Sequence, residues 1–153
     1  MMQSNLKIIL EGSESVCKTT FAEFLQTQTP DFQYFHFSSA DFKNCSSLKK
    51  FNMIKSYLEN FEGPVIIDRL YLSTYIYDTL YKRPNKITRR QVKKLHKIAI
   101  KKGWIILHLF SDNTKYIKKN ESDFIKGNIL KINKMFNKVA RRLKITNINV
   151  FMD

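Results

Sequence analysis

Hydrophobic and polar positions along the chain predict strands that alternate with helices. Apolar runs of strand length, the second with only weak alternation, lie at 6–10, 33–37, 65–68, 104–110 and 148–152. Helix-compatible composition, or apolar residues spaced by three and four, predicts helices at 19–25, 48–61, 70–81, 88–102 and 125–143. The alternation predicts an α/β fold of three layers, in which a parallel sheet of about five strands is flanked by helices on both faces.

Length and composition predict one folded domain over residues 1–153. A hydrophobic content of 43% with 26% charged residues is typical of a globular protein. No apolar run approaches the roughly 20 residues that a membrane-spanning helix needs, and the first residues lack the long apolar stretch of a signal peptide. We therefore expect a cytoplasmic location and no membrane partner.

The chain is strongly basic, with 27 Lys and Arg against 13 Asp and Glu and a net charge of +14. Such a charge favours anionic partners, among them nucleotides and nucleic acid. The excess is mostly Lys in a chain with many Ile and Asn residues, which is also what an A/T-rich coding sequence would produce. The charge by itself therefore does not choose a partner.

A loop that resembles a phosphate-binding loop follows the first predicted strand. The stretch EGSESVCKTT at 11–20 fits the pattern G-x-x-x-x-G-K-[ST], except that the second glycine is a cysteine. In such loops, backbone N–H groups wrap the phosphates, the lysine reaches the terminal phosphates and the hydroxyl after it holds Mg²⁺. The alternative is a tight turn with a solvent-exposed lysine. The pattern predicts ATP binding by Gly12, Ser13, Ser15, Val16, Cys17, Lys18, Thr19 and Thr20, with Thr19 as a metal ligand.

An acid and a base, Asp68 and Arg69, stand at the end of the strand predicted at 65–68. Ligands of parallel sheets bind beyond the carboxyl ends of the strands, so this pair should face the loop at Gly12. A carboxylate there can hold Mg²⁺ or its water, and a guanidinium can clamp a phosphate with two hydrogen bonds. The alternative is a pair that only caps the next helix.

Together, the two motifs resemble those of the thymidylate kinases and the related deoxynucleotide and deoxynucleoside kinases, including short phage versions. The family pattern E-G-x-D-x-x-G-K-[ST]-T is matched by Glu11, Gly12, Glu14, Lys18, Thr19 and Thr20. The pattern D-R-Y-x-x-S-x-x-A-Y is matched by Asp68, Arg69, Ser73 and Tyr77. The resemblance implies a P-loop kinase fold and a magnesium- and ATP-dependent phosphotransferase of nucleotide biosynthesis.

The resemblance also implies roles for single residues. Lys18, Asp68 and Arg69 would be catalytic, with Asp68 near Mg²⁺ and Arg69 on the phosphate of the acceptor. A Lys-rich segment at about 112–126 resembles the family's lid, in which Lys118 and Lys119 would contact ATP, although it could equally be a solvated basic loop. The residues expected to bind the acceptor are Glu14, Asp41, Phe42, Arg69, Ser73 and Tyr77.

Three departures from the family pattern leave alternatives open. Cys17 replaces a glycine, Leu70 replaces a tyrosine, and the segment 36–42 lacks the arginine that thymidylate kinases place there. The main expectation is a nucleoside monophosphate kinase that acts on a deoxynucleotide. A deoxynucleoside kinase, with Asp41 as its base, and an inactive homologue that binds nucleotides or a partner are the alternatives. Nucleic acid is not expected as a partner, because that idea rests on charge alone, and the resemblance admits a homodimer.

Overall fold

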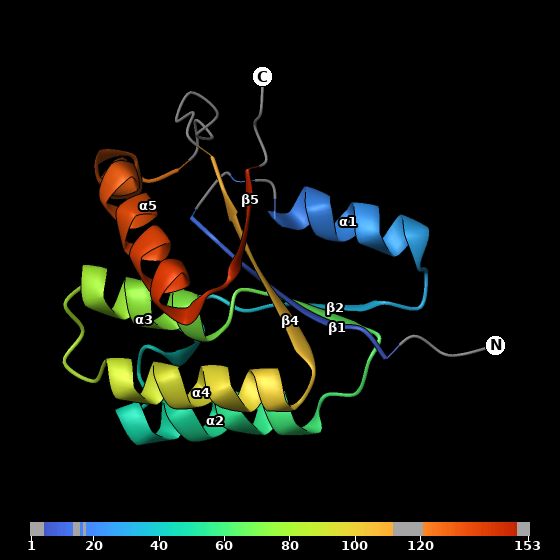
Figure 1. The fold of residues 1–153 in the computed structure, drawn as a ribbon. Helices are drawn as coiled ribbons and strands as arrows, with labels where there is room; N and C mark the ends of the chain where they lie inside the picture. Colours follow the sequence, from blue (N-terminus) through green and yellow to red (C-terminus); the bar gives the residue numbers. More distant parts are fainter. Residues whose placement is uncertain (1–4, 14–15, 17, 112–120, 150–153) are drawn as a thin grey trace.

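Strands and helices alternate along the chain in a computed structural model that describes residues 5–13, 16, 18–111 and 121–149 (Figure 1). The strands are β1 (Lys7–Glu11), β2 (Gln33–His36), β3 (Val65–Asp68), β4 (Trp104–Phe110) and β5 (Thr146–Asn149). The α-helices are α1 (Lys18–Gln28), α2 (Ser47–Asn60), α3 (Tyr71–Leu80), α4 (Arg89–Lys101) and α5 (Asp123–Leu143). A short 3₁₀ helix, η1 (Ser39–Phe42), follows β2.

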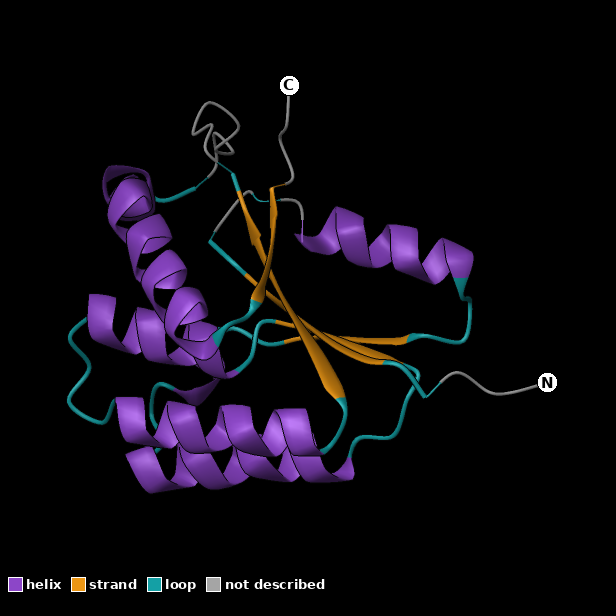
Figure 2. Cartoon of the chain, in the orientation of Figure 1, coloured by secondary structure: helices purple, strands orange, loops and turns teal. Residues whose placement is uncertain are grey.

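The strands, drawn as orange arrows in Figure 2, form one parallel sheet in the order β2-β3-β1-β4-β5. In its register, Leu10 of β1 is opposite Asp68 of β3, and Glu11 is opposite His108 of β4. The carboxyl ends of the two central strands therefore lie side by side. This pairing brings the loop after β1 next to Asp68 and Arg69, as the sequence predicts.

Two apolar clusters, one on each face of the sheet, hold the three layers together. On one face, alternate residues of β1, β3 and β4 pack against α2, α3, α4 and α5. On the other face, the remaining strand residues pack with Ala22 and Leu25 of α1. Figure 1 shows α1 alone on its side of the sheet and the other helices on the opposite side. The predicted three-layer α/β fold is confirmed.

Local signals in the sequence explain where several elements begin. Ser46, Thr88 and Ser122 each accept a hydrogen bond from a backbone N–H in the first turn of α2, α4 and α5, respectively. The segment after β2 contains η1, because Ser38 and Asp41 cap each other's backbone N–H groups. The last strand begins at Thr146, two residues before the predicted start at 148. Among the described residues, no helix is long and apolar enough to cross a membrane.

Candidate functional site

The loop after β1 begins with a glycine that no other residue can replace without strain. Gly12 has a φ of +155°, and a Cβ atom built there would lie 2.3 Å from the backbone oxygen of Leu109. The backbone of β4 therefore fixes the path of the loop. Val16 is buried against the α1 side of the sheet. Glu14, Ser15 and Cys17 were also predicted to bind nucleotide or acceptor, and they lie outside the described residues.

Lys18 lies inside the loop and not in solvent. Its side chain is 6% exposed, and its Nζ donates a hydrogen bond of 2.6 Å to the backbone oxygen of Ser13. The buried Ser13 hydroxyl has no hydrogen-bond partner among the described residues. A buried ammonium beside an unpaired hydroxyl does not fit the alternative of a plain turn with an exposed lysine.

The Asp68 carboxylate meets the start of α1 at the edge of the sheet. Its Oδ2 accepts a hydrogen bond of 2.6 Å from the Tyr34 hydroxyl, lies 3.3 Å from Nδ1 of His36 and 3.5 Å from Oγ1 of Thr19. Burial, followed by the hydrogen bond to Asp68, raises the pKa of Tyr34 to about 12. Tyr34 therefore stays protonated and holds the carboxylate in place.

Thr19 and Asp68 fit the predicted role of magnesium ligands. Oδ1 of Asp68 is buried and has no hydrogen-bond partner among the described residues, so it can accept a metal ion or its water. The structure has no group of three or more His, Cys, Asp or Glu side chains that could hold a metal within the part of the chain it describes. Mg²⁺ needs no such group when substrate phosphates complete its coordination, because one or two carboxylates then suffice.

Glu11, to which the sequence gives no role beyond a motif match, links the loop to α3. It is fully buried, and its carboxylate accepts the backbone N–H groups of Leu70, Leu72 and Ser73 at 2.9, 3.1 and 3.1 Å. The Ser73 hydroxyl also donates to it. Burial raises the pKa of Glu11, although these hydrogen bonds and the charge of Arg69 act in the opposite direction. Ser73, predicted to bind the acceptor, is thus buried behind the site.

Arg69 leaves β3 with an unusual backbone conformation. Its φ is +70°, its N–H donates to the oxygen of Leu10 at 2.8 Å, and its guanidinium lies 5.3 Å from the ring centre of Tyr77. A positive φ at a non-glycine residue is strained and is often found at functional sites. This turn directs the arginine toward α3, on the side where a pocket lies.

A pocket of about 310 Å³ lies beside Asp68. His36, which contacts Asp68, lies in its wall. The wall also contains Ser38, Ser39, Arg69, Tyr77, Tyr81, Arg83 and Ile125. Arg69 and Tyr77 were predicted at this place. Phe42 was predicted there too, but it is 1% exposed and packs in the core, and the exposed Asp41 accepts the N–H of Ser38 at 2.7 Å.

Arg83 is a second cation in this pocket that the sequence does not reveal. Its Nη1 donates to Oδ1 of Asp78 at 2.9 Å and to the backbone oxygen of Ser39 at 3.1 Å. Asp78 is fully buried and also accepts from Nζ of Lys50, likewise fully buried, at 2.7 Å. One carboxylate therefore holds two cations, which leaves a net positive charge next to the pocket.

Aromatic rings lie in the wall of the same pocket and beside it. Tyr81 stacks on Phe124, with ring centres 5.1 Å apart, and on Tyr77, with ring centres 6.4 Å apart. Tyr81 and Phe124 are 44% and 45% exposed, so part of each ring is available to a ligand. Lys118 and Lys119 of the predicted lid lie outside the described residues.

Comparisons with known proteins agree with this fold. No family model matches the sequence, and no curated protein sequence is a significant match. Among solved structures, YorR from Bacillus subtilis, in complex with phosphorylated GDP, has a TM-score of 0.75 at 22% identity, over 93% of this chain and 83% of that one. Thymidylate kinase from Candida albicans has a TM-score of 0.59 at 16% identity, over 97% of this chain and 85% of that one.

A deoxyadenosine kinase from M. mycoides, with the products dCMP and dCDP bound, has a TM-score of 0.56 at 15% identity, over 97% of this chain and 92% of that one. The chain therefore has the fold of the P-loop nucleotide and nucleoside kinases. The loop at Gly12 and Lys18 and the carboxylate at Asp68 occupy the carboxyl edge of its sheet.

Proposed function

We propose that this protein transfers the γ-phosphoryl group of ATP to the phosphate of a deoxynucleoside monophosphate. The observation that carries the proposal is the pair of arginines, Arg69 and Arg83, in the pocket that adjoins Asp68. Two guanidinium groups suit a phosphate monoester, which they can bind with several charge-assisted hydrogen bonds. The fold supports the proposal, since it is shared with a thymidylate kinase and a deoxyadenosine kinase.

The loop between β1 and α1 would hold the donor. Its backbone N–H groups and the N-terminus of α1 attract phosphate oxygens, and the Lys18 ammonium within the loop offsets their charge. Mg²⁺, held through Thr19 and Asp68, would supply further positive charge at the phosphate oxygens. Tyr34 and His36 keep the Asp68 carboxylate in position for that role.

The transfer itself requires no covalent step on the protein. An oxygen of the acceptor phosphate forms a bond to the γ-phosphorus while the bond from that phosphorus to the β–γ bridging oxygen breaks. The products are a nucleoside diphosphate and ADP. Because phosphoryl transfer depends mainly on positioning and charge, the protein's part is to bring the two anions together against Lys18, Arg69 and Arg83.

A nucleoside acceptor is less compatible with the site. A deoxynucleoside kinase needs a carboxylate that takes the proton of the sugar hydroxyl. Asp41, the expected candidate, is exposed and already accepts the backbone N–H of Ser38. Two arginines would also have no anion to bind if the acceptor carried no phosphate. The monophosphate is therefore the favoured acceptor.

Radiolabelled ATP tests this function directly. Transfer of label from the γ-position to a panel of deoxynucleoside monophosphates, with Mg²⁺ present, should yield labelled diphosphates that chromatography separates. Lys18→Ala should abolish the transfer, whereas Lys131→Ala, an exposed lysine of α5, should not change it. Absence of any labelled diphosphate with a folded wild-type protein would refute the proposal.

A further inference from the structure

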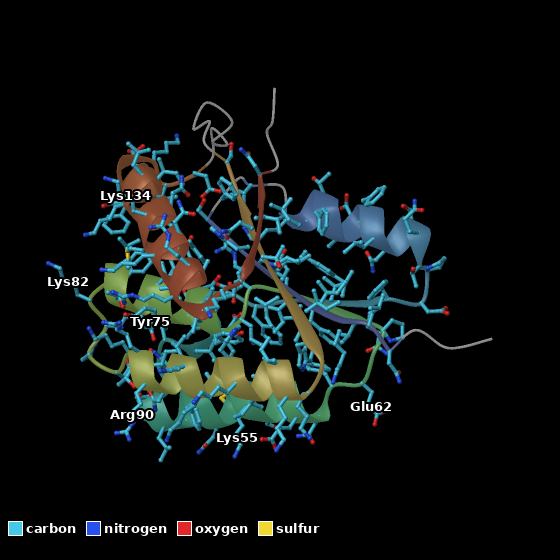
Figure 3. All side chains as sticks on the ribbon, viewed as in Figure 1. Lys55, Glu62, Tyr75, Lys82, Arg90 and Lys134 are labelled. Carbon is cyan, nitrogen blue, oxygen red and sulfur yellow. The ribbon has the colours of Figure 1, made fainter. Side chains whose placement is uncertain are left out.

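A second, larger hollow lies between α3, α4 and the end of α5. Its volume is about 600 Å³, within the usual range of ligand sites. Its wall includes Tyr75 from α3, three basic residues from α4 and Arg142 from α5. Figure 3 labels Tyr75 and Arg90, which lie on the same side of the molecule. We call this hollow the α4–α5 groove.

The α4–α5 groove is separate from the pocket near Asp68. Arg142 stands at the last turn of α5, whereas Ile125, in the first turn, lines the pocket with Arg69 and Arg83. At 1.5 Å per residue, these two positions on α5 are about 25 Å apart. No residue lines both hollows. The proposed phosphotransfer chemistry therefore does not account for the groove.

Its basic residues have no acidic partners in the part of the chain that the structure describes. Arg89, Arg90, Lys93 and Arg142 line the groove, and none of them forms an ion pair with a described residue. The sequence from 79 to 111, which includes all of α4, contains no Asp or Glu. Like charges gathered around a hollow repel one another, and a bound anion would relieve that repulsion.

The basic surface continues from the groove along α4. Arg89, Lys93, Lys97 and Lys101 are exposed and follow one another at intervals of four, so they form one row on the helix. The row is about 18 Å long at 1.5 Å per residue. Arg89 and Lys93 belong to both the row and the groove. A ligand that satisfies both must therefore carry several anionic groups in succession.

Apolar and aromatic atoms complete the groove. Tyr75 and Val139, both partly buried, line it beside the basic residues. A charged row next to an aromatic surface is the arrangement by which proteins bind single-stranded nucleic acid, with phosphates on the cations and a base on the ring. A lipid surface has no base to place against Tyr75.

We infer that the α4–α5 groove and the row on α4 bind single-stranded nucleic acid, with a base against Tyr75 and the backbone along Arg89, Lys93 and Lys97. The net charge of the sequence did not predict such a partner. The structure adds two observations, namely a hollow and a set of cations around it that form no ion pair with a described residue. The inference is independent of the proposed kinase activity.

Fluorescence anisotropy with a labelled single strand of roughly 15 nucleotides tests the inference on the full chain. Binding should weaken steeply with salt. The double variant Arg89→Gln/Lys93→Gln should reduce the magnitude of the log–log salt slope by about 1.4, because each phosphate contact on a single strand contributes about 0.7. Tyr75→Leu should weaken binding about tenfold without changing that slope.

A matched control distinguishes binding at the α4–α5 groove from nonspecific attraction to the net positive charge of the protein. Lys131→Gln/Lys134→Gln removes the same charge from exposed positions in the middle of α5, and Figure 3 shows Lys134 well separated from Arg90. This control should bind as the wild type does. Equal weakening by both double variants would overturn the inference, as would full competition by a free mononucleotide or binding only to vesicles of anionic lipid.

Discussion

Arg83 and Asp78 are joined by a hydrogen bond of 2.9 Å between the guanidinium and a fully buried carboxylate. The same carboxylate holds Lys50, so the position of Arg83 depends on the core of the protein and not on its own flexible stem. A rigid arginine loses little freedom when it binds a ligand. We therefore propose Arg83 as a fixed partner for the acceptor phosphate, together with Arg69 in the wall of the same pocket.

Replacement of Arg83 by methionine tests its proposed contact with the acceptor. Loss of a charge-assisted hydrogen bond costs about 1.5–3 kcal/mol, so KM for the monophosphate should rise about 10- to 100-fold. KM for ATP should remain close to that of the wild type. Steady-state kinetics with each substrate varied in turn separates the two effects. Arg90→Met, a change of the same kind on α4, should leave both constants unaltered, and an unchanged acceptor KM in the Arg83 variant would remove this residue from the site.

The Lys50, Asp78 and Arg83 triad should make unequal contributions to stability. Asp78→Asn leaves two cations around a neutral group in the interior and should lower the free energy of unfolding by about 3–5 kcal/mol. Lys50→Met leaves Asp78 still paired with Arg83 and should cost less. Urea denaturation followed by circular dichroism measures both. If Lys50→Met proved the more damaging change, the assignment of Asp78 as the centre of the triad would be wrong.

Two glycines provide a matched test of the loop. Gly12→Ala should abolish ATP binding, because its Cβ would lie 2.3 Å from the Leu109 oxygen and the loop would have to move. Gly127 is in α5, where an added Cβ would meet no atom within 4 Å, so Gly127→Ala should stabilise the protein by about 0.5–1 kcal/mol. Calorimetric titration with a nonhydrolysable ATP analogue and thermal unfolding give the two results. Normal ATP binding by Gly12→Ala would mean that the loop does not hold the donor.

The contribution of the buried His96 and His108 to the free energy of unfolding should fall as the pH drops below about 6.5. Burial lowers the pKa of His96 and of His108 below the usual 6.5, so the unfolded chain takes up protons that the folded chain does not. Their contribution is complete above pH 6.5 and is lost as the pH falls toward their lowered values. Glu11, with a raised pKa, acts in the opposite direction, so the comparison needs a variant.

His108→Gln is that variant, and urea denaturation at several pH values is the measurement. The free energy of unfolding should depend less on pH in His108→Gln than in the wild type between about pH 6.5 and 5. Glu11 is present in both proteins, so its contribution cancels. An identical dependence in both proteins would show that His108 titrates alike in the folded and unfolded states.

The carboxyl edge of the sheet could be predicted from the sequence, whereas the pocket could be predicted only in part, through Arg69 and Tyr77. The strands at 65–68 and 104–110 were predicted with the bounds that β3 and β4 have, because buried parallel strands are short apolar runs. Parallel pairing of β1 with β3 then places Asp68 beside the loop after β1, and so near Thr19 at the start of α1. Glu14, Ser15, Cys17, Lys118 and Lys119 lie outside the described residues, so their roles remain predictions.

Side-chain direction, which the pattern of the sequence does not give, explains the differences in the pocket. Phe42 follows β2 as predicted, but η1 turns its ring into the core. Leu72 and Ser73 lie in the first turn of α3, and their backbone N–H groups donate hydrogen bonds to the Glu11 carboxylate. The Ser73 side chain therefore faces Glu11. Arg83 follows α3 with no motif or periodicity, and its hydrogen bonds to the buried Asp78 and to the backbone of Ser39 direct it to the pocket.

Acceptor preference is the most direct test of the account. With ATP and Mg²⁺ fixed, kcat/KM should be measured for thymidine and its monophosphate, and for the other three deoxynucleosides and their monophosphates. We predict that at least one monophosphate exceeds its own nucleoside by about 100-fold or more, since two arginines bind the phosphate and each contributes about 1.5–3 kcal/mol. Equal or greater kcat/KM for every nucleoside would contradict the assignment of Arg69 and Arg83 to the acceptor phosphate.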